Sequence, residues 1–143
     1  MIRIASRRSL PVLAAVVALT LAACSSGSSS TPLPSGGEPP SDCARVENGV
    51  IELSAANIEF SAPCMVANAG EAFTIRFTNE ESAPHDVNVY PDSSKGETLM
   101  DGEVISTQGE SLDYAVEALD EGEYYFDCSI HTQMSGTLYV VSG

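Results

Sequence analysis

The chain has 143 residues, with 6 Lys and Arg against 20 Asp and Glu, and a formal net charge of −14. This length suits one ordinary domain, and 43 % hydrophobic with 18 % charged residues supplies a core and argues against global disorder. The acidic balance argues against nucleic-acid binding, which needs clustered Lys and Arg, while 11 Gly and 8 Pro argue against a helical bundle.

The first segment, residues 1–23, has the composition of an export signal. Three Arg precede a mostly apolar run, Leu10–Ala23, which is too short to span a bilayer comfortably. The run ends in the sequence LAAC, which resembles a bacterial lipobox, where the cysteine is lipid-modified and becomes the first mature residue. We predict a lipoprotein signal peptide over 1–23 and lipidation of Cys24. An ordinary secretory signal cut nearby is the alternative, and the pair Arg7-Arg8 leaves twin-arginine export open.

Residues 24–42 begin with the predicted lipidated cysteine and continue with a stretch rich in Ser, Gly and Pro. Such a stretch has no apolar face to bury, so we predict a disordered linker between a membrane anchor and a domain over residues 43–143. The domain would face the periplasm or the extracellular side. After signal removal, 20 acids remain against Arg45, Arg76 and Lys95. This imbalance indicates either a solvated surface or attraction toward a basic partner protein.

Short segments with the periodicity of strands follow along residues 43–143. The clearest is 72–78, where Phe73, Ile75 and Phe77 alternate with polar residues. Further segments of this kind are 50–53, 58–60, 86–90, 112–116, 124–126 and 137–141. Gly, Pro and Asn separate them. Regularly spaced short strands with no long helical period predict an all-β sandwich or barrel.

The four cysteines divide by position. Export would place them in an oxidising compartment, where structural disulfides persist. If Cys24 is lipidated, three remain. Cys43 and Cys64 flank the first predicted strands, and pairing them would close a loop of about 20 residues and stabilise the domain by about 3 kcal/mol. Cys128 is then left over, either as a small buried hydrophobe or as a thiolate with a chemical role.

Cys128 belongs to a Cys-x-x-His-x-x-Met sequence with His131 and Met134, at a predicted turn between two strands. The chain has two histidines, and the other, His85, lies at the start of the predicted strand 86–90. Thiolate and thioether are soft donors that suit Cu(I), and imidazole suits both copper oxidation states. Two imidazoles, one thiolate and a weak thioether are the donor set of blue copper. The sequence predicts a site for one copper ion; a core histidine and a buried thiol without metal are the alternative.

Residues 45–143 resemble a cupredoxin, a small type 1 blue copper protein of the plastocyanin and amicyanin type. The resemblance rests on residues 84–87, similar to the family's first-ligand strand, and on 122–141, similar to its C-terminal ligand loop with the short amicyanin-like spacing. It implies a Greek-key β-sandwich. It also implies that the equatorial copper ligands are His85, Cys128 and His131 and that the axial ligand is Met134. In the family the loop histidine lies near the surface and is the exit for electrons, which here would be His131.

This resemblance implies a carrier of single electrons between redox partner proteins, not an enzyme, and the predicted lipidation of Cys24 would anchor it to a membrane. A lipoprotein that binds, buffers or delivers copper without redox turnover is the alternative, although the chain has no Met-rich or His-rich tract. A Cys-His hydrolase is disfavoured because no Gly-rich oxyanion turn accompanies Cys128. Multicopper catalysis needs more histidines than the two present.

Asp86 departs from the family pattern, which commonly has Asn after the first ligand histidine, where it ties the two ligand loops together; Thr132 also replaces a common Pro. A carboxylate that lies beside a thiolate-bound copper without binding it favours the oxidised ion. We therefore expect Asp86→Asn to raise the reduction potential, measured by redox titration. An unchanged potential would show that Asp86 does not act on the metal through its ligands.

Overall fold

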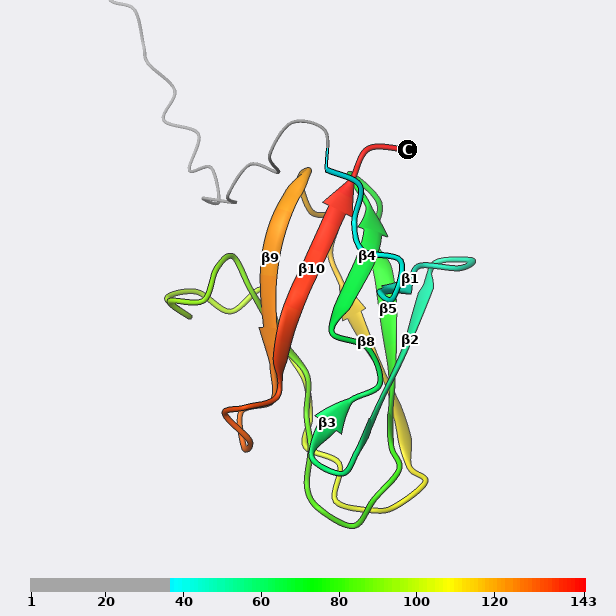
Figure 1. Ribbon diagram of the computed structural model, residues 1–143, viewed down its shortest axis with the longest axis vertical. Coiled ribbons are helices and arrows are strands. Elements are labelled where there is room, and N and C mark those ends of the chain that lie inside the picture. Colours follow the sequence, from blue (N-terminus) through cyan, green and yellow to red (C-terminus); the bar gives the residue numbers. More distant parts are fainter. Residues whose placement is uncertain (1–36) are drawn as a thin grey trace, which may run out of the picture.

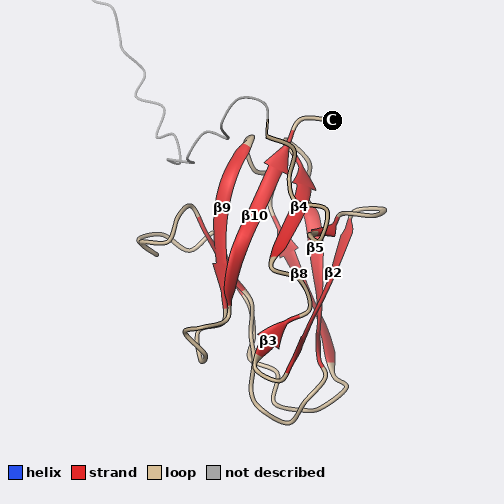
Figure 2. Ribbon diagram, in the orientation of Figure 1, coloured by secondary structure: helices blue, strands red, loops and turns tan. Residues whose placement is uncertain are grey.

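The computed structural model describes residues 37–143 (Figure 1). The predicted signal peptide (1–23), Cys24 and most of the predicted linker (24–42) lie outside the described residues. Among residues 37–143, no helix is long and apolar enough to cross a membrane. Figure 2 shows this part of the chain as strands and loops, and the all-β prediction is confirmed.

Ten strands occur in the described part of the chain. Their bounds are β1 (Ala44–Arg45), β2 (Val50–Ala56), β3 (Glu59–Phe60), β4 (Cys64–Asn68), β5 (Phe73–Asn79), β6 (Asn88–Tyr90), β7 (Met100–Asp101), β8 (Ser111–Val116), β9 (Gly122–Asp127) and β10 (Ser135–Val141). They form a six-stranded sheet in the order β1-β4-β10-β9-β6-β7 and a four-stranded sheet in the order β3-β2-β5-β8. Neighbours such as β4 and β10 are far apart in sequence because the chain crosses between the sheets, as Greek-key connections do.

The core lies between the two sheets and consists of the apolar side chains that alternate along the strands. In β5, Phe73, Ile75 and Phe77 are buried, as their period of two predicted. Phe60 of β3 bridges the sheets, because its ring centroid lies 5.3 Å from that of Phe126 on β9 and 6.2 Å from that of Phe77. Aromatic contacts of this kind stabilise a sandwich beyond the area that they bury.

The pairing of Cys43 with Cys64 is confirmed, with a Cα–Cα distance of 4.5 Å. The disulfide attaches the chain just before β1 to the first residue of β4, across a sequence separation of 21 residues. Closing a loop of this length contributes about 3 kcal/mol in the chain-entropy account. Cys128 is the free cysteine of the described residues, and it is buried.

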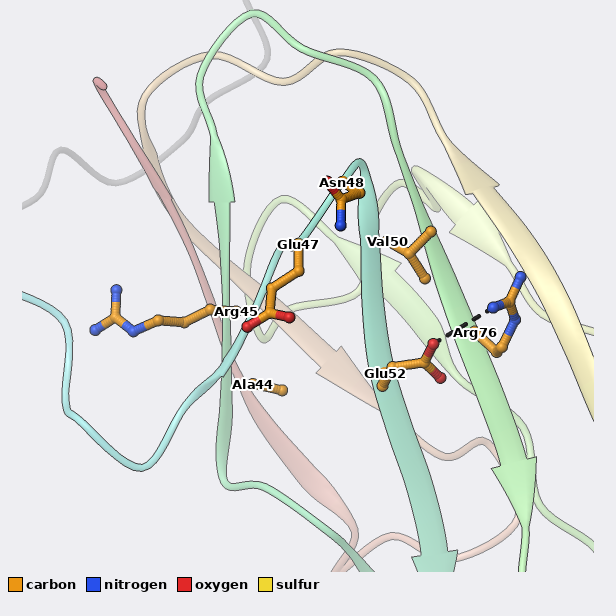
Figure 3. A pocket seen from close by; sticks show the side chains of 7 residues that line it. All are labelled: Ala44, Arg45, Glu47, Asn48, Val50, Glu52 and Arg76. Atoms are coloured by element: carbon orange, nitrogen blue, oxygen red, sulfur yellow. Dashed lines mark hydrogen bonds and ion pairs between the residues drawn. The ribbon is translucent and has the colours of Figure 1, made fainter.

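A polar hollow opens beside β1, β2 and β5 (Figure 3). Arg76 lines this hollow. Its Nη1 lies 3.4 Å from a carboxylate oxygen of Glu52, and its Nε lies 2.8 Å from a carboxylate oxygen of Asp113 on β8. The hydrogen bonds from this guanidinium hold the pKa of Asp113 below its usual range. The residues lining the hollow include no histidine or cysteine, and the ion pairs of Arg76 lie on exposed side chains of the four-stranded sheet.

Gly136, the second residue of β10, has no room for a side chain. A Cβ there would lie 2.3 Å from the carbonyl oxygen of Pro63 and 2.4 Å from Cζ of Phe126. We expect Gly136→Ala to lower the free energy of unfolding by about 1–3 kcal/mol, measured by urea denaturation. Gly96→Ala is the matched control, because its Cβ would meet only Ser94 Oγ at 3.8 Å. Equal losses in the two variants would contradict the packing argument.

Candidate metal centre

The antiparallel pairing of β6 with β9 brings His85 close to Cys128, the described cysteine that is not in the disulfide. Asn88 pairs with Asp127, so the residues just before β6 and just after β9 lie at the same end of the sheet. His85 precedes β6 and is held by a two-way backbone bridge to Ile105, with N···O distances of 3.0 and 2.8 Å. Cys128 follows β9 directly. Two residues 43 positions apart therefore become neighbours.

The three nitrogen and sulfur donors converge. Cys128 Sγ lies 3.9 Å from Nδ1 of His85 and 3.7 Å from Nδ1 of His131, and the three atoms are all within 4.8 Å of one another. The two imidazole rings have centroids 4.7 Å apart. Three donors around one ion with bonds of about 2.0–2.3 Å are separated from one another by about 3.5–4 Å when trigonal. The observed separations match that geometry, so the residues present fit a copper ion.

The loop between β9 and β10 is closed by two backbone hydrogen bonds. The N–H of Cys128 donates to the carbonyl of Met134 (3.0 Å), and the N–H of Met134 donates to the carbonyl of His131 (2.9 Å). Met134 is 2 % exposed and belongs to the same apolar cluster as Cys128, which is 1 % exposed. His85 is fully buried, whereas His131 is partly exposed. The centre is therefore asymmetric, with one imidazole inside the protein and the other at its surface.

Asp86 joins the two ligand segments. One carboxylate oxygen accepts a hydrogen bond from the N–H of Ser129 at 2.7 Å, and the other accepts from the Ser129 hydroxyl. Ser129 follows Cys128, and Asp86 is only 3 % exposed. The carboxylate thus makes the link between loops that the resemblance implied for Asn at this position. Its effect on the potential stays a prediction.

The sequence argument missed Asn79 and Glu81, which fix the loop in front of His85. Asn79 is fully buried, and its side-chain NH₂ donates to the carbonyls of Ala83 (2.8 Å) and Ile105 (2.9 Å), while its Oδ1 accepts from the N–H of Glu81 (3.0 Å). Glu81 Oε1 lies 2.8 Å from His85 Nε2. A carboxylate four residues before a candidate ligand was the available signal, but its relevance depends on the loop conformation.

The buried carboxylate of Asp127, the residue before Cys128, was also missed. It is 1 % exposed, directly precedes Cys128, and pairs with Lys95 Nζ. Lys95 lies over the rings of Tyr90 and Tyr125, with its Nζ 5.9 and 5.8 Å from their centroids. The lysine balances the buried negative charge of Asp127, and the two rings add a cation–π contribution.

Burial raises the pKa of the Cys128 thiol, so the metal-free protein keeps its proton at neutral pH. Copper binds the thiolate, and its uptake therefore releases a proton. We expect the affinity for Cu(I), which does not oxidise thiols, to rise about tenfold per pH unit between about pH 6 and 8. Competition with a chelator of known pH dependence measures this. Cys128→Ser should lose most of the slope, and a pH-independent affinity of the unmodified protein would contradict the prediction.

Comparisons with known proteins agree with the fold. Residues 12–140 match the family model described as a cupredoxin-like domain. No curated protein sequence is significantly similar to the chain. Amicyanin from Paracoccus versutus is a similar solved structure, with 25% identity, coverage of 67% of this chain and 85% of that chain, and a TM-score of 0.50. Auracyanin A from Chloroflexus aurantiacus, a "blue" copper protein, has 18% identity, coverage of 68% and 99%, and a TM-score of 0.57. The chain belongs to the cupredoxin-like family.

Proposed function

We propose that this protein carries single electrons through one copper ion bound by His85, Cys128, His131 and Met134. The observation that carries the proposal is the convergence of both imidazole Nδ1 atoms on Cys128 Sγ, at 3.9 and 3.7 Å. When bound, copper supplies a one-electron Cu(II)/Cu(I) couple. His85, Cys128 and His131 would supply two imidazole nitrogens and a thiolate to the ion, and Met134 would add a weak thioether.

The protein's contribution is to fix the positions of the ligands and to bury most of them away from solvent. The Cys128–Met134 backbone hydrogen bond and the link from Asp86 to Ser129 fix both ligand segments before any metal arrives. A centre whose ligands are held in this way needs little rearrangement between the two oxidation states, which favours fast transfer of an electron. His131, the partly exposed ligand, is the route by which an electron would enter or leave.

The relatives support this chemistry. Auracyanin A is described as a "blue" copper protein, and a mutant of amicyanin has been solved in a reduced Cu(I) form. Burial of Cys128 to 1 % exposure and the raised pKa of its thiol are the opposite of what an activated nucleophile needs. These features favour a carrier over a hydrolase.

The cell envelope is the proposed setting. Lipid on Cys24 and the linker over 24–42 would tether the domain to a membrane, facing the periplasm or the extracellular side. The described residues include only three basic side chains, Arg45, Arg76 and Lys95, while the chain has 20 acidic ones. The partners would be redox proteins with a basic docking surface that complements this negative charge. Residues 43–143 would form the copper domain.

A visible absorption spectrum tests the function. The protein loaded with Cu(II) should show an intense blue thiolate-to-copper band that bleaches with ascorbate and returns on oxidation. Cys128→Ser should lose the band, while Ser129→Ala, which removes no metal donor and leaves the backbone hydrogen bond to Asp86, should keep it. A protein that stays colourless with Cu(II) yet binds Cu(I) tightly would favour copper delivery or buffering. Binding of neither ion would contradict the site.

A further inference from the structure

One carboxylate oxygen contacts both the buried histidine and a distant turn. Glu81 Oε1 accepts a hydrogen bond from the N–H of Ile58 at 2.8 Å, and the same atom lies 2.8 Å from Nε2 of His85. Ile58 is 23 residues from Glu81 in sequence, in the connection between β2 and β3. A single atom therefore joins the tip of one hairpin to a metal-ligand side chain.

The turn at this hairpin tip has an uncommon backbone conformation. Asn57 and Ile58 have φ angles of 56° and 60°. The left-handed region is tolerated by Asn but is a true outlier for a β-branched residue such as Ile. Such a conformation persists only where its surroundings hold it. The pairing of Ala55 with Phe60 and the hydrogen bond from Ile58 N–H to Glu81 are the contacts that hold this turn.

The same carboxylate decides which nitrogen of His85 is available. The imidazole is fully buried, with Nε2 facing Glu81 and Nδ1 facing Cys128 Sγ at 3.9 Å. A neutral imidazole that donates Nε2–H to a carboxylate presents an unprotonated Nδ1, which is the form that binds a metal. The Glu81 side chain is 26% exposed, so it lies at the boundary between the centre and solvent.

We propose that Glu81 is a positioning residue that couples the Asn57–Ile58 turn to the copper ligand His85. It holds the imidazole with Nδ1 toward the metal, and it fixes the turn through the same oxygen. The coupling is reciprocal, so that metal binding stabilises the turn and the anchored turn keeps the ligand in place. The proposal rests on the proposed function, because copper is the ion that His85 would bind.

The tautomer of His85 in the metal-free protein is the first test. Nitrogen-15 NMR at about pH 8 should show Nε2–H and a bare Nδ1. Glu81→Ala should give a mixture of tautomers, whereas Glu81→Gln, whose amide oxygen still accepts, should keep the Nε2–H form. Glu80→Gln is the matched control, since it removes the same charge at the neighbouring, exposed position. An Nδ1–H tautomer in the unmodified protein, or no change in Glu81→Ala, would overturn the proposal.

The reduction potential separates an effect on the metal from one on folding. Removing the carboxylate charge disfavours Cu(II) relative to Cu(I), and we expect Glu81→Gln to lower the ratio of the two affinities about tenfold, equivalent to a rise of about 59 mV. Glu80→Gln should shift the potential far less, because solvent screens its charge. Equal shifts in the two variants would contradict a specific role for Glu81. The Glu81→Gln variant should still fold, because its amide oxygen can accept the same hydrogen bonds.

Amide exchange at Ile58 tests the coupling itself. Loading with Cu(I) should slow exchange of the Ile58 N–H by about fivefold or more, and the effect should be absent in Glu81→Ala. Unchanged exchange in the unmodified protein would overturn the coupling. Failure of the proposed function is distinguishable, because it would appear as a missing blue band in the unmodified protein, while the tautomer is measured without copper.

Discussion

The pairing of β6 with β9 is the constraint on which the metal centre depends. Asn88 opposite Asp127 sets the register, and this register brings His85 to the same end of the sheet as Cys128. A slip of β6 by one residue would turn its buried face outward. The register is protected because Val89 and Phe126, which pair with each other, are both fully buried in the core. The hydrophobic packing that folds the sandwich thereby also positions its ligands.

Three carboxylates near the ligand residues each have a partner of their own. Glu81 contacts His85, Asp86 follows His85 in sequence, and Asp127 precedes Cys128. Glu81 faces an imidazole, Asp86 receives two hydrogen bonds from Ser129, and Asp127 pairs with Lys95. Each of these carboxylates thus has a hydrogen-bond or ion-pair partner, which limits the cost of burying it.

Sequence reasoning located the parts of this protein that carry a local signal. The alternation in β5 and the Cys-x-x-His-x-x-Met spacing can be recognised in the sequence without knowing which residues are close in space. The disulfide could be predicted because the chain has few cysteines to pair. β4 was missed because four of its five residues are buried, so that no alternation marks it; β1 and β7 have two residues each. The predicted strand 86–90 begins only at Asn88, and Asp86 is instead hydrogen-bonded to Ser129 beside Cys128. Asn79 and Glu81 act through loop contacts that no periodicity encodes.

The disulfide also has a mechanical consequence. In Figure 1 the first described residues and the C-terminus lie at the top of the sandwich, and the loop between β9 and β10 lies toward the other end. A pull on the chain ahead of Cys43 reaches the domain at the covalent link to Cys64, and from there spreads along β4 into β10 through five paired positions. The weak two-residue pairing of β1 need not bear that load. Tension applied to the chain before Cys43 would thus be absorbed by the six-stranded sheet before it could distort the ligand loop.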